Sequence, residues 1–262
     1  MVLLLFVDLD PSLAALRPLG AFFTVRTLLG SAGETPRRSP TLAHAYGFVT
    51  SELCVNPLTF RVDKVAAALR APEPRIAASV AHLGLAARLW SIALGCAVRY
   101  GRLPDLDPRL LHWDPDASAP DELWLAELRP GPPADAAALA DAVLLGHLEP
   151  LAAALRAEHR LAPGLLRGNA ASALAGAARE VDRWARAEGS PATGERARAL
   201  AAELLGHPLL AGTGTLTGTS FRRRSCCLYY RLPGGGVCGD CCFTTPPRPP
   251  GPSRSSPRAA SG

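Results

Sequence analysis

The sequence predicts a mainly α protein of the α+β class, with a helical domain, a small β element and a C-terminal cysteine-rich lobe. Three observations lead to this prediction. Apolar residues recur at steps of three and four through most of residues 11–210, as they do along one face of a helix. Stretches of alternating apolar and polar residues, which indicate strands, are few and short. Five of the seven cysteines lie between residues 226 and 242.

The helical part of the prediction depends on four long periodic segments. The clearest segment starts near Ile76 and ends at Gly101, because glycine commonly ends helices. In the second segment we expect a kink at Pro150, since proline lacks the amide hydrogen that a helix interior needs. In the last segment Thr193 is the expected N-cap and Gly206 the C-terminal stop. The segments cover residues 76–98, 139–155, 165–187 and 193–205.

The β element is predicted from three short stretches. Residues 21–28 alternate in part between apolar and polar side chains. Residues 110–113 and 123–128 flank a turn-rich stretch from Asp114 to Asp121, which is typical of a hairpin with a long loop.

Changes in composition divide the chain into a helical domain over residues 1–210, a cysteine segment over 211–243 and a tail over 244–262. The tail is rich in proline, serine and arginine, and we expect it to be disordered because it has too little apolar surface to bury. Residues 1–7 are apolar, but no basic residue precedes them and Asp8 follows. We therefore expect a buried strand or helix start there and not a secretion signal.

Charge and hydropathy restrict the partners and the compartment. Residues 221–262 hold seven arginines and one acidic residue, Asp240, so they carry +6, while the other 21 basic and 22 acidic residues leave −1 for residues 1–220. This local charge differs from the broad basic face with aromatic residues that binds nucleic acid, so we expect no nucleic-acid partner. No apolar run approaches the roughly 18 residues of a membrane span. We expect no transmembrane segment and a cytoplasmic protein.

The cysteine cluster is the strongest functional signal in the chain. Cys226 and Cys227 are adjacent, ten residues separate them from Cys238, and two more residues lead to Cys241. In a reducing compartment such clustered thiols favour metal binding over disulfides. Four thiolates are also the ligand set of a [2Fe–2S] cluster, and Gly239 is expected to permit a tight loop between the last two. Adjacent cysteines can both bind only if the chain bends beside them, because neighbouring side chains diverge in extended backbone.

Two other interpretations of the cysteines remain open at this point. A four-cysteine zinc site more often uses two separated pairs, so the adjacent pair weighs against zinc without excluding it. The thiols could also be unligated or form disulfides. Cys242 directly follows Cys241 and could replace it as a ligand, and we prefer Cys241 because its loop to Cys238 is tighter.

The stretch FRRRSCCLYYRLPGGGVCGDC, residues 221–241, closely resembles the C-terminal segment of the FhuF-like ferric-siderophore reductases. Weaker similarity is found at residues 82–91, 146–151 and 168–172, so the resemblance covers about residues 10–242. Arg167 and Cys242 depart from the family pattern, which would have tryptophan and an ordinary residue there. The resemblance implies that Cys226, Cys227, Cys238 and Cys241 hold a [2Fe–2S] cluster, which makes the C-terminal region an iron–sulfur lobe.

The resemblance also implies an activity, namely one-electron reduction of siderophore-bound ferric iron with release of Fe(II). Ferrous iron is softer than ferric iron and is held less well by the hard oxygen donors of a siderophore. No dinucleotide-binding motif is found, so a partner such as a ferredoxin or a flavin reductase would supply the electron. The protein could act at the inner face of the membrane, where siderophores enter. The alternatives are a non-catalytic electron carrier or redox or iron sensor, and a structural zinc module.

Other noteworthy side chains have mainly structural explanations. Arg222 to Arg224 and Arg231 could attract anionic complexes or stabilise a reduced cluster, or they could be solvated or paired with the helical domain. We expect the histidines at 82, 112 and 147 and the tryptophans at 90, 113, 124 and 184 to be interior or rim residues. Cys54 and Cys96 are expected to be buried free thiols. Asn169 is expected to lock a helix start or to line the cluster site.

Overall fold

The computed structural model of the chain describes residues 9–10, 13–27, 39–47, 56–117, 123–245 and 247. The expectations for residues 1–7 and Cys54, and that of a disordered tail beyond residue 247, lie outside the described residues. Helices form most of the structure and the sheets are small, which confirms the predicted fold class.

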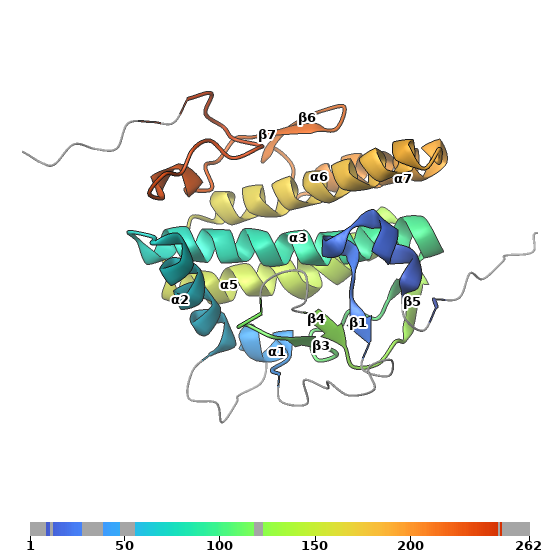
Figure 1. Ribbon diagram of the computed structural model, residues 1–262, viewed down its shortest axis with the longest axis horizontal. Coiled ribbons are helices and arrows are strands. Elements are labelled where there is room, and N and C mark those ends of the chain that lie inside the picture. The colour runs from blue at the N-terminus through green and yellow to red at the C-terminus, as the bar shows by residue number, and fades with distance from the viewer. Residues whose placement is uncertain are drawn as a thin grey trace, which may run out of the picture.

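The helices are stacked in layers (Figure 1). Helix α3 runs through the middle, α6 and α7 lie above it, and the C-terminal lobe lies above α6. Helix α5 and the small sheet lie below α3 (Figure 1). The helices span Leu42–Ala45 (α1), Pro57–Leu69 (α2), Pro74–Tyr100 (α3), Ala136–Leu139 (α4), Glu149–Glu158 (α5), Pro163–Ala187 (α6) and Pro191–Leu205 (α7).

Helix α3 is the central core helix, as its apolar periodicity predicted. It starts with Pro74, a residue suited to a first turn, and ends at Gly101, which adopts the left-handed conformation. Helices α2 and α6 and the 3-10 helices Ala14–Leu19 (η1) and Ala21–Phe23 (η2) cover it. Gly95 allows this close packing, since a Cβ there would lie 2.9 Å from the Phe23 ring.

By length and apolar composition alone, α3 and the segment Ala136–Glu158 could each cross a membrane. In α3, however, 72% of the apolar window is buried inside the fold, and 44% in the second segment. A buried core helix of a soluble protein satisfies the same length and composition test, so the finding is compatible with a soluble protein.

The remaining predicted helices are present, with two differences. The second segment is continuous but contains a π-helical stretch, Ala140–Leu148 (η4), immediately before Pro150 in α5. The π-helical stretch precedes the proline, whose missing amide hydrogen falls in the first turn of α5. The prediction of Thr193 as N-cap is wrong: Ser190 takes that position, Pro191 starts α7 and Thr193 lies in the first turn. Gly206 ends α7 as predicted.

The β element contains the predicted hairpin. Strand Leu111–Trp113 (β3) pairs antiparallel with Leu123–Leu125 (β4). The strand expected over 21–28 is wrong in its first half, which forms η2, and only Arg26–Thr27 (β1) pairs, parallel to β4. The buried guanidinium of Arg88 donates to backbone carbonyls of this segment, among them that of Thr24 at 2.7 Å. Arg102–Pro104 (β2) and Pro130–Pro133 (β5) form a second small sheet.

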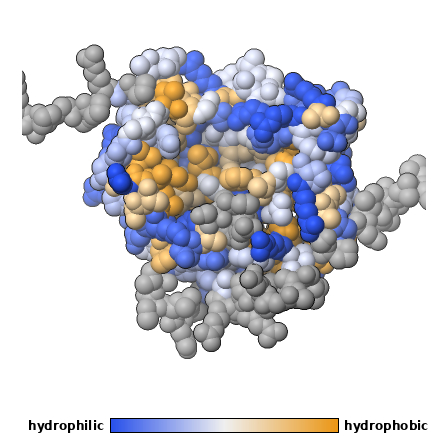
Figure 2. Space-filling view, in the orientation of Figure 1, coloured by the Kyte–Doolittle hydropathy of each residue, from blue (hydrophilic) through white to orange (hydrophobic). Residues whose placement is uncertain are grey.

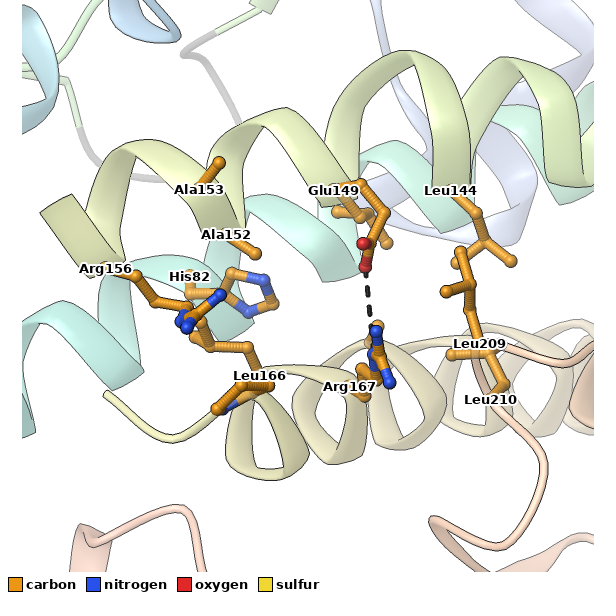
Figure 3. A pocket seen from close by; sticks show the side chains of 13 residues that line it. His82, Leu144, Glu149, Ala152, Ala153, Arg156, Leu166, Arg167, Leu209 and Leu210 are labelled. Atoms are coloured by element: carbon orange, nitrogen blue, oxygen red, sulfur yellow. Dashed lines mark ion pairs between the residues drawn. The ribbon is translucent and has the colours of Figure 1, made fainter. Parts of the chain in front are cut away.

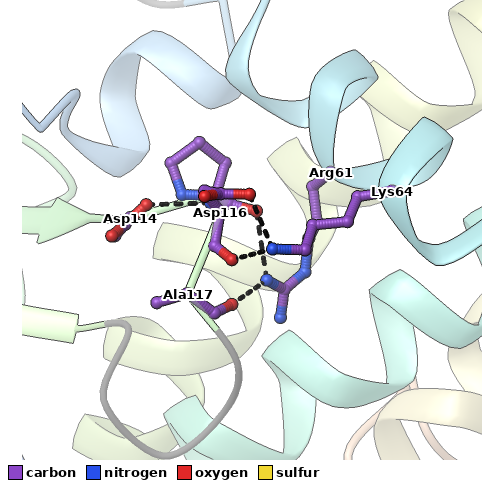
Figure 4. Close-up of polar contacts among 6 residues, drawn as sticks. Arg61, Lys64, Asp114, Asp116 and Ala117 are labelled. Carbon is purple, nitrogen blue, oxygen red and sulfur yellow. Dashed lines mark hydrogen bonds and ion pairs between the residues drawn. The ribbon is translucent and has the colours of Figure 1, made fainter. Parts of the chain in front are cut away.

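Helix α2, which the sequence analysis did not predict, anchors the loop that follows β3 (Figure 4). Arg61 donates to the backbone carbonyls of Pro115 and Ala117, and Lys64 pairs with the Asp116 carboxylate at 2.6 Å. Because these contacts are partly or fully exposed, they position the loop more than they stabilise the fold.

Candidate metal centre

The cysteine segment starts from a β-hairpin that the sequence analysis did not predict. Strands Gly214–Thr217 (β6) and Ser220–Arg223 (β7) pair antiparallel, and Gly218 in their turn has φ of 61°. The chain then folds into loops with one 3-10 turn, Tyr229–Arg231 (η5). The amide of Arg223 donates to the carbonyl of Asp240 at 3.0 Å, which draws the loop of the later cysteines beside β7.

The chain bends at the adjacent cysteines, as binding by both would require. Leu228, directly after the pair, has φ of 71°, a left-handed conformation that is costly for a branched side chain. This bend lets the Leu228 amide donate back to the sulfur of Cys226 at 3.2 Å. The backbone is thus strained at Leu228, directly after the two cysteines whose side chains would bind the same metal centre.

The sulfur atoms of the segment contact one another. Cys227 Sγ lies 3.5 Å from Cys238 Sγ, close to the roughly 3.8 Å edge expected for a tetrahedral metal with bonds of ~2.3 Å to thiolate sulfur. Cys226 interacts with Cys227, and Cys242 with both Cys226 and Cys241. Among the described residues no group of three or more Cys, His, Asp or Glu side chains already has the geometry of a metal site, so the contacts are pairwise.

The surroundings of the sulfurs favour the thiolate form most strongly at Cys227. Hydrogen bonds from the Cys226 and Cys238 thiols lower the pKa of Cys227, and the positive charge of Arg223 adds to this effect. The Phe243 amide donates to Cys241 Sγ at 3.4 Å, as the Leu228 amide does to Cys226. Backbone N–H groups directed at sulfur are the usual means by which proteins tune iron–sulfur clusters.

The loop between Cys238 and Cys241 is tight, but not for the predicted reason. The amide of Cys241 donates to the carbonyl of Cys238 at 3.1 Å, which closes a four-residue turn. Gly239 is not among the glycines with positive φ, so its expected special conformation is wrong. Glycine is needed earlier, at Gly234 with φ of 73° and at Gly235, where a Cβ would collide with the Tyr229 carbonyl oxygen.

The lobe is fastened to α3 and α6 by a chain of buried polar contacts. Ser79 on α3 donates its hydroxyl to the carbonyl of Cys227 at 2.8 Å. Asn169 on α6 donates to the Ser79 carbonyl at 2.9 Å and accepts from Arg223 at 2.6 Å. Asn169 is thus no helix-start residue, since α6 begins at Pro163; it joins the helical layer to the backbone of a cysteine.

A second contact holds the loop of Cys238 and Cys241. Asp240, between these cysteines, accepts a hydrogen bond from Ser172 at 2.6 Å and forms an ion pair with Arg179 at 3.3 Å. The carboxylate is 9% exposed, so these partners compensate for the loss of water around it. Both partners lie on α6, which makes this helix the main support of the cysteine lobe.

Of the supporting residues, only Asn169 was considered for the cluster site, although the sequence carries a signal for those on α6. Asn169, Ser172 and Arg179 follow steps of three and seven, so they occupy one face of α6. Polar residues at such spacing in an otherwise alanine- and leucine-rich helix indicate a polar docking face. Ser79 carried no comparable signal, because only packing brings α3 to Cys227.

The arginines near the cysteines divide into different roles. Arg222 and Arg224 are exposed, whereas Arg223 between them is buried. Arg231 pairs with Glu73 at the start of α3 at 2.7 Å, and this contact contributes to lowering the pKa of Glu73, after that of Arg75. Arg231 therefore forms an ion pair with the helical domain.

The predicted interior residues are interior. His147 is buried and contacts the Tyr46 hydroxyl at 3.0 Å and the Leu106 carbonyl oxygen at 2.7 Å, and burial lowers its pKa to about 4. The Nδ1 atom of His112 lies 3.0 Å from the Ser39 carbonyl oxygen. Cys96 is a buried free thiol whose pKa is raised by burial. Trp90, Trp113 and Trp124 are buried, and Trp184 packs against the core.

His82 lines a small pocket of about 90 Å³ between α3, α5 and α6 (Figure 3). Its ring lies between Ala152 and Leu166, with Arg156 on one side, and Glu149 and Arg167 approach each other to 4.0 Å further along. Burial and the nearby Arg223 charge lower the pKa of His82 to about 3, so its ring is neutral. The pocket is mainly apolar.

A larger groove of about 360 Å³ adjoins the cysteine lobe. The segment from Leu19 to Phe23, α3 and α6 form its walls, which are mostly apolar. Ser172 and Arg179, the two partners of Asp240, both line it. Apolar residues also gather in a band across the middle of the face shown in Figure 2, with hydrophilic residues toward its edges.

Thiols in mutual contact and amide donors to sulfur are the features of a thiolate metal site, and four thiolates are the ligand set of a [2Fe–2S] cluster. The comparison with protein families agrees: the family model described as FhuF 2Fe-2S C-terminal domain matches residues 223–243. Comparison with curated proteins gives no match. Residues 223–243 therefore match the iron–sulfur segment of the FhuF family, and this match indicates a [2Fe–2S] cluster, as the resemblance of residues 221–241 implied. This result favours the iron–sulfur interpretation over a structural zinc site.

Proposed function

We propose that the protein reduces siderophore-bound ferric iron by one electron, with Cys226, Cys227, Cys238 and Cys241 as the cluster ligands. A [2Fe–2S] cluster carries one electron at a time, which matches the Fe(III) to Fe(II) step. Reduction weakens the hold of hard oxygen donors on the iron and so favours its release. The observation that carries the proposal is the contact of Cys227 with Cys226 and Cys238 within a segment that matches the FhuF iron–sulfur domain.

The accessibility of the site supports exchange of an electron with an external partner. Cys226, Cys238, Cys241 and Cys242 are partly exposed, while Cys227 is buried. The exposed Arg222 and Arg224 place positive charge beside them and would attract anionic iron complexes or acidic partner proteins. The groove next to Asp240 offers apolar surface near the cluster loop for the organic part of a siderophore.

The electron would come from a partner such as a ferredoxin or a flavin reductase, and the reaction would take place in the cytoplasm or at the inner face of the membrane. The second candidate is an iron–sulfur protein that only carries electrons or senses iron or redox state. Partial exposure of the sulfurs suits that role as well. The two functions therefore differ only in whether a ferric siderophore accepts the electron from the cluster.

Stopped-flow mixing of the reduced protein with ferric siderophores separates the two functions. The protein is purified anaerobically, reduced with dithionite and desalted, then mixed with ferric complexes of several donor classes and an Fe(II) chelator. A reductase is expected to reoxidise with at least one complex and to release chelated Fe(II) in equal amount. Cluster bands that stay bleached with every complex would contradict the reductase. Cys238→Ser, expected to lack the cluster, controls for residual dithionite.

A further inference from the structure

Arg223 has a position that a charged side chain rarely occupies. In β7 the burial alternates, so that Phe221 and Arg223 face inward while Ser220 and Arg222 face solvent. Arg223 is only 2% exposed. An inward position of this hairpin would normally take an apolar residue, as it does at Phe221, because a buried charge loses its hydration.

The guanidinium of Arg223 is held in place but not neutralised by the protein. Its Nη2 donates to Asn169 Oδ1 at 2.6 Å and to the Leu165 carbonyl at 3.2 Å, both uncharged acceptors. Its Nε and Nη1 are buried and have no hydrogen-bond partner among the described residues. None of the carboxylates in the described part of the chain forms an ion pair with it, and that of Asp240 is engaged by Ser172 and Arg179.

The surrounding structure makes room for this charge beside the cysteines. Gly168 on α6 lacks a side chain where a Cβ would lie 3.1 Å from Arg223 Nη2. The Arg223 amide donates to the carbonyl of Asp240, between Cys238 and Cys241. Its guanidinium binds Asn169, which donates to the carbonyl of Ser79. The Ser79 hydroxyl in turn donates to the carbonyl of Cys227. The Arg223 charge also lowers the pKa of His82, after burial.

We propose that Arg223 is the buried counter-charge of the cluster and that it stabilises the reduced state. A cluster held by four thiolates is negatively charged, and one-electron reduction adds a further negative charge. A fixed cation in a poorly hydrated site stabilises the more negative state more strongly and so raises the reduction potential. The exposed Arg222 and Arg224 are screened by water and salt and contribute much less. The proposal depends on the cluster and not on which acceptor the protein reduces.

Redox titration of the purified full-length holoprotein, followed by its visible absorption, tests this role. Arg223→Gln removes the charge, Arg223→Lys keeps it with different hydrogen bonding, and Arg224→Gln removes an exposed charge from the adjacent position. We expect Arg223→Gln to make reduction about tenfold less favourable, which is a potential lower by about 59 mV for one electron. Arg223→Lys and Arg224→Gln should each change the equilibrium by less than about twofold.

The remaining outcomes of the redox titration either overturn or support the counter-charge role of Arg223. A change of less than about twofold in Arg223→Gln, or a higher potential, would overturn the proposal. If Arg223→Gln fails to retain the cluster, a loaded Arg223→Lys with nearly wild-type potential supports a role of charge. An Arg223→Lys protein that is also empty, or that shifts as far as Arg223→Gln, shows that the hydrogen bonds of the guanidinium matter, and the counter-charge idea is then wrong.

Discussion

The connection between Asn169 and the cysteine lobe gives the sharpest prediction for stability. Asn169 is fully buried and joins Arg223 to Ser79, whose hydroxyl binds the carbonyl of Cys227. Asn169→Ala removes both connections. It leaves the Arg223 guanidinium with only the Leu165 carbonyl and leaves a void beside the lobe.

The magnitude follows from the contacts that are lost. A hydrogen bond to a charged group contributes about 1.5–3 kcal/mol and a neutral one about 0.5–1.5 kcal/mol. Because the groups left behind are buried, we expect Asn169→Ala to lower the free energy of unfolding by about 3–5 kcal/mol. At about 2–4 °C per kcal/mol for a chain of this size, the melting midpoint should drop by roughly 6–20 °C.

Thermal unfolding followed by circular dichroism, together with the visible absorption of the cluster, measures this effect. Asn56→Ala is the matched control, because Asn56 caps α2 by accepting a hydrogen bond from the Leu58 amide at 2.7 Å, a contact within α2 and not with the lobe. It should cost about 1 kcal/mol and leave the cluster bands unchanged. If Asn169→Ala loses less than 1 kcal/mol and keeps a full cluster, the proposed fastening of the lobe through Asn169 is incorrect.

Three further predictions concern the ligands, the lobe contact and pH. Serine at Cys226, Cys227, Cys238 or Cys241 should lose or strongly weaken the cluster absorption, while Cys242→Ser should keep it; loss with Cys242→Ser and retention with Cys241→Ser would reverse the choice of ligand. Gly168→Ala places a Cβ against Ser225 Oγ and near Arg223, and it should cost about 1–3 kcal/mol in chemical unfolding. Gly164→Ala, whose Cβ would meet nothing within 4 Å, should cost less than 1 kcal/mol, and equal losses would contradict the close approach. Burial lowers the pKa of His147 to about 4, so below about pH 6.5 the unfolded chain takes up a proton that the folded chain does not, and stability falls as pH falls toward 4. In urea unfolding, His147 should lower the free energy of unfolding by about 1.4 kcal/mol near pH 5.5 relative to a pH well above 6.5. An unchanged pH dependence in His147→Gln would refute this assignment.

Much of the helical fold was predictable because its signals are local. The steps of three and four from Ile76 onward correspond to α3, and Gly101 ends that helix in the left-handed conformation. Local signals failed where partners distant in sequence override them. Arg88 on α3 binds the backbone carbonyls of Ala21 and Thr24, where alternation predicted a strand and a 3-10 helix forms instead. The start of α7 was misplaced for a local reason, because Pro191 occupies the first helical position and Thr193 lies within the first turn.

The same division applies to the metal centre. The sequence by itself indicated the class of cofactor. The cysteine spacing predicted a metal site and the resemblance of residues 221–241 implied a [2Fe–2S] cluster, and both are properties of one short segment. Only the tertiary structure decided which residues support that segment. Ser79, Asn169 and Ser172 reach it because α3 and α6 pack side by side beneath the lobe. Burial likewise separates Arg223 from the arginines on either side, since a strand turns alternate side chains to opposite faces and only one of them faces the helices.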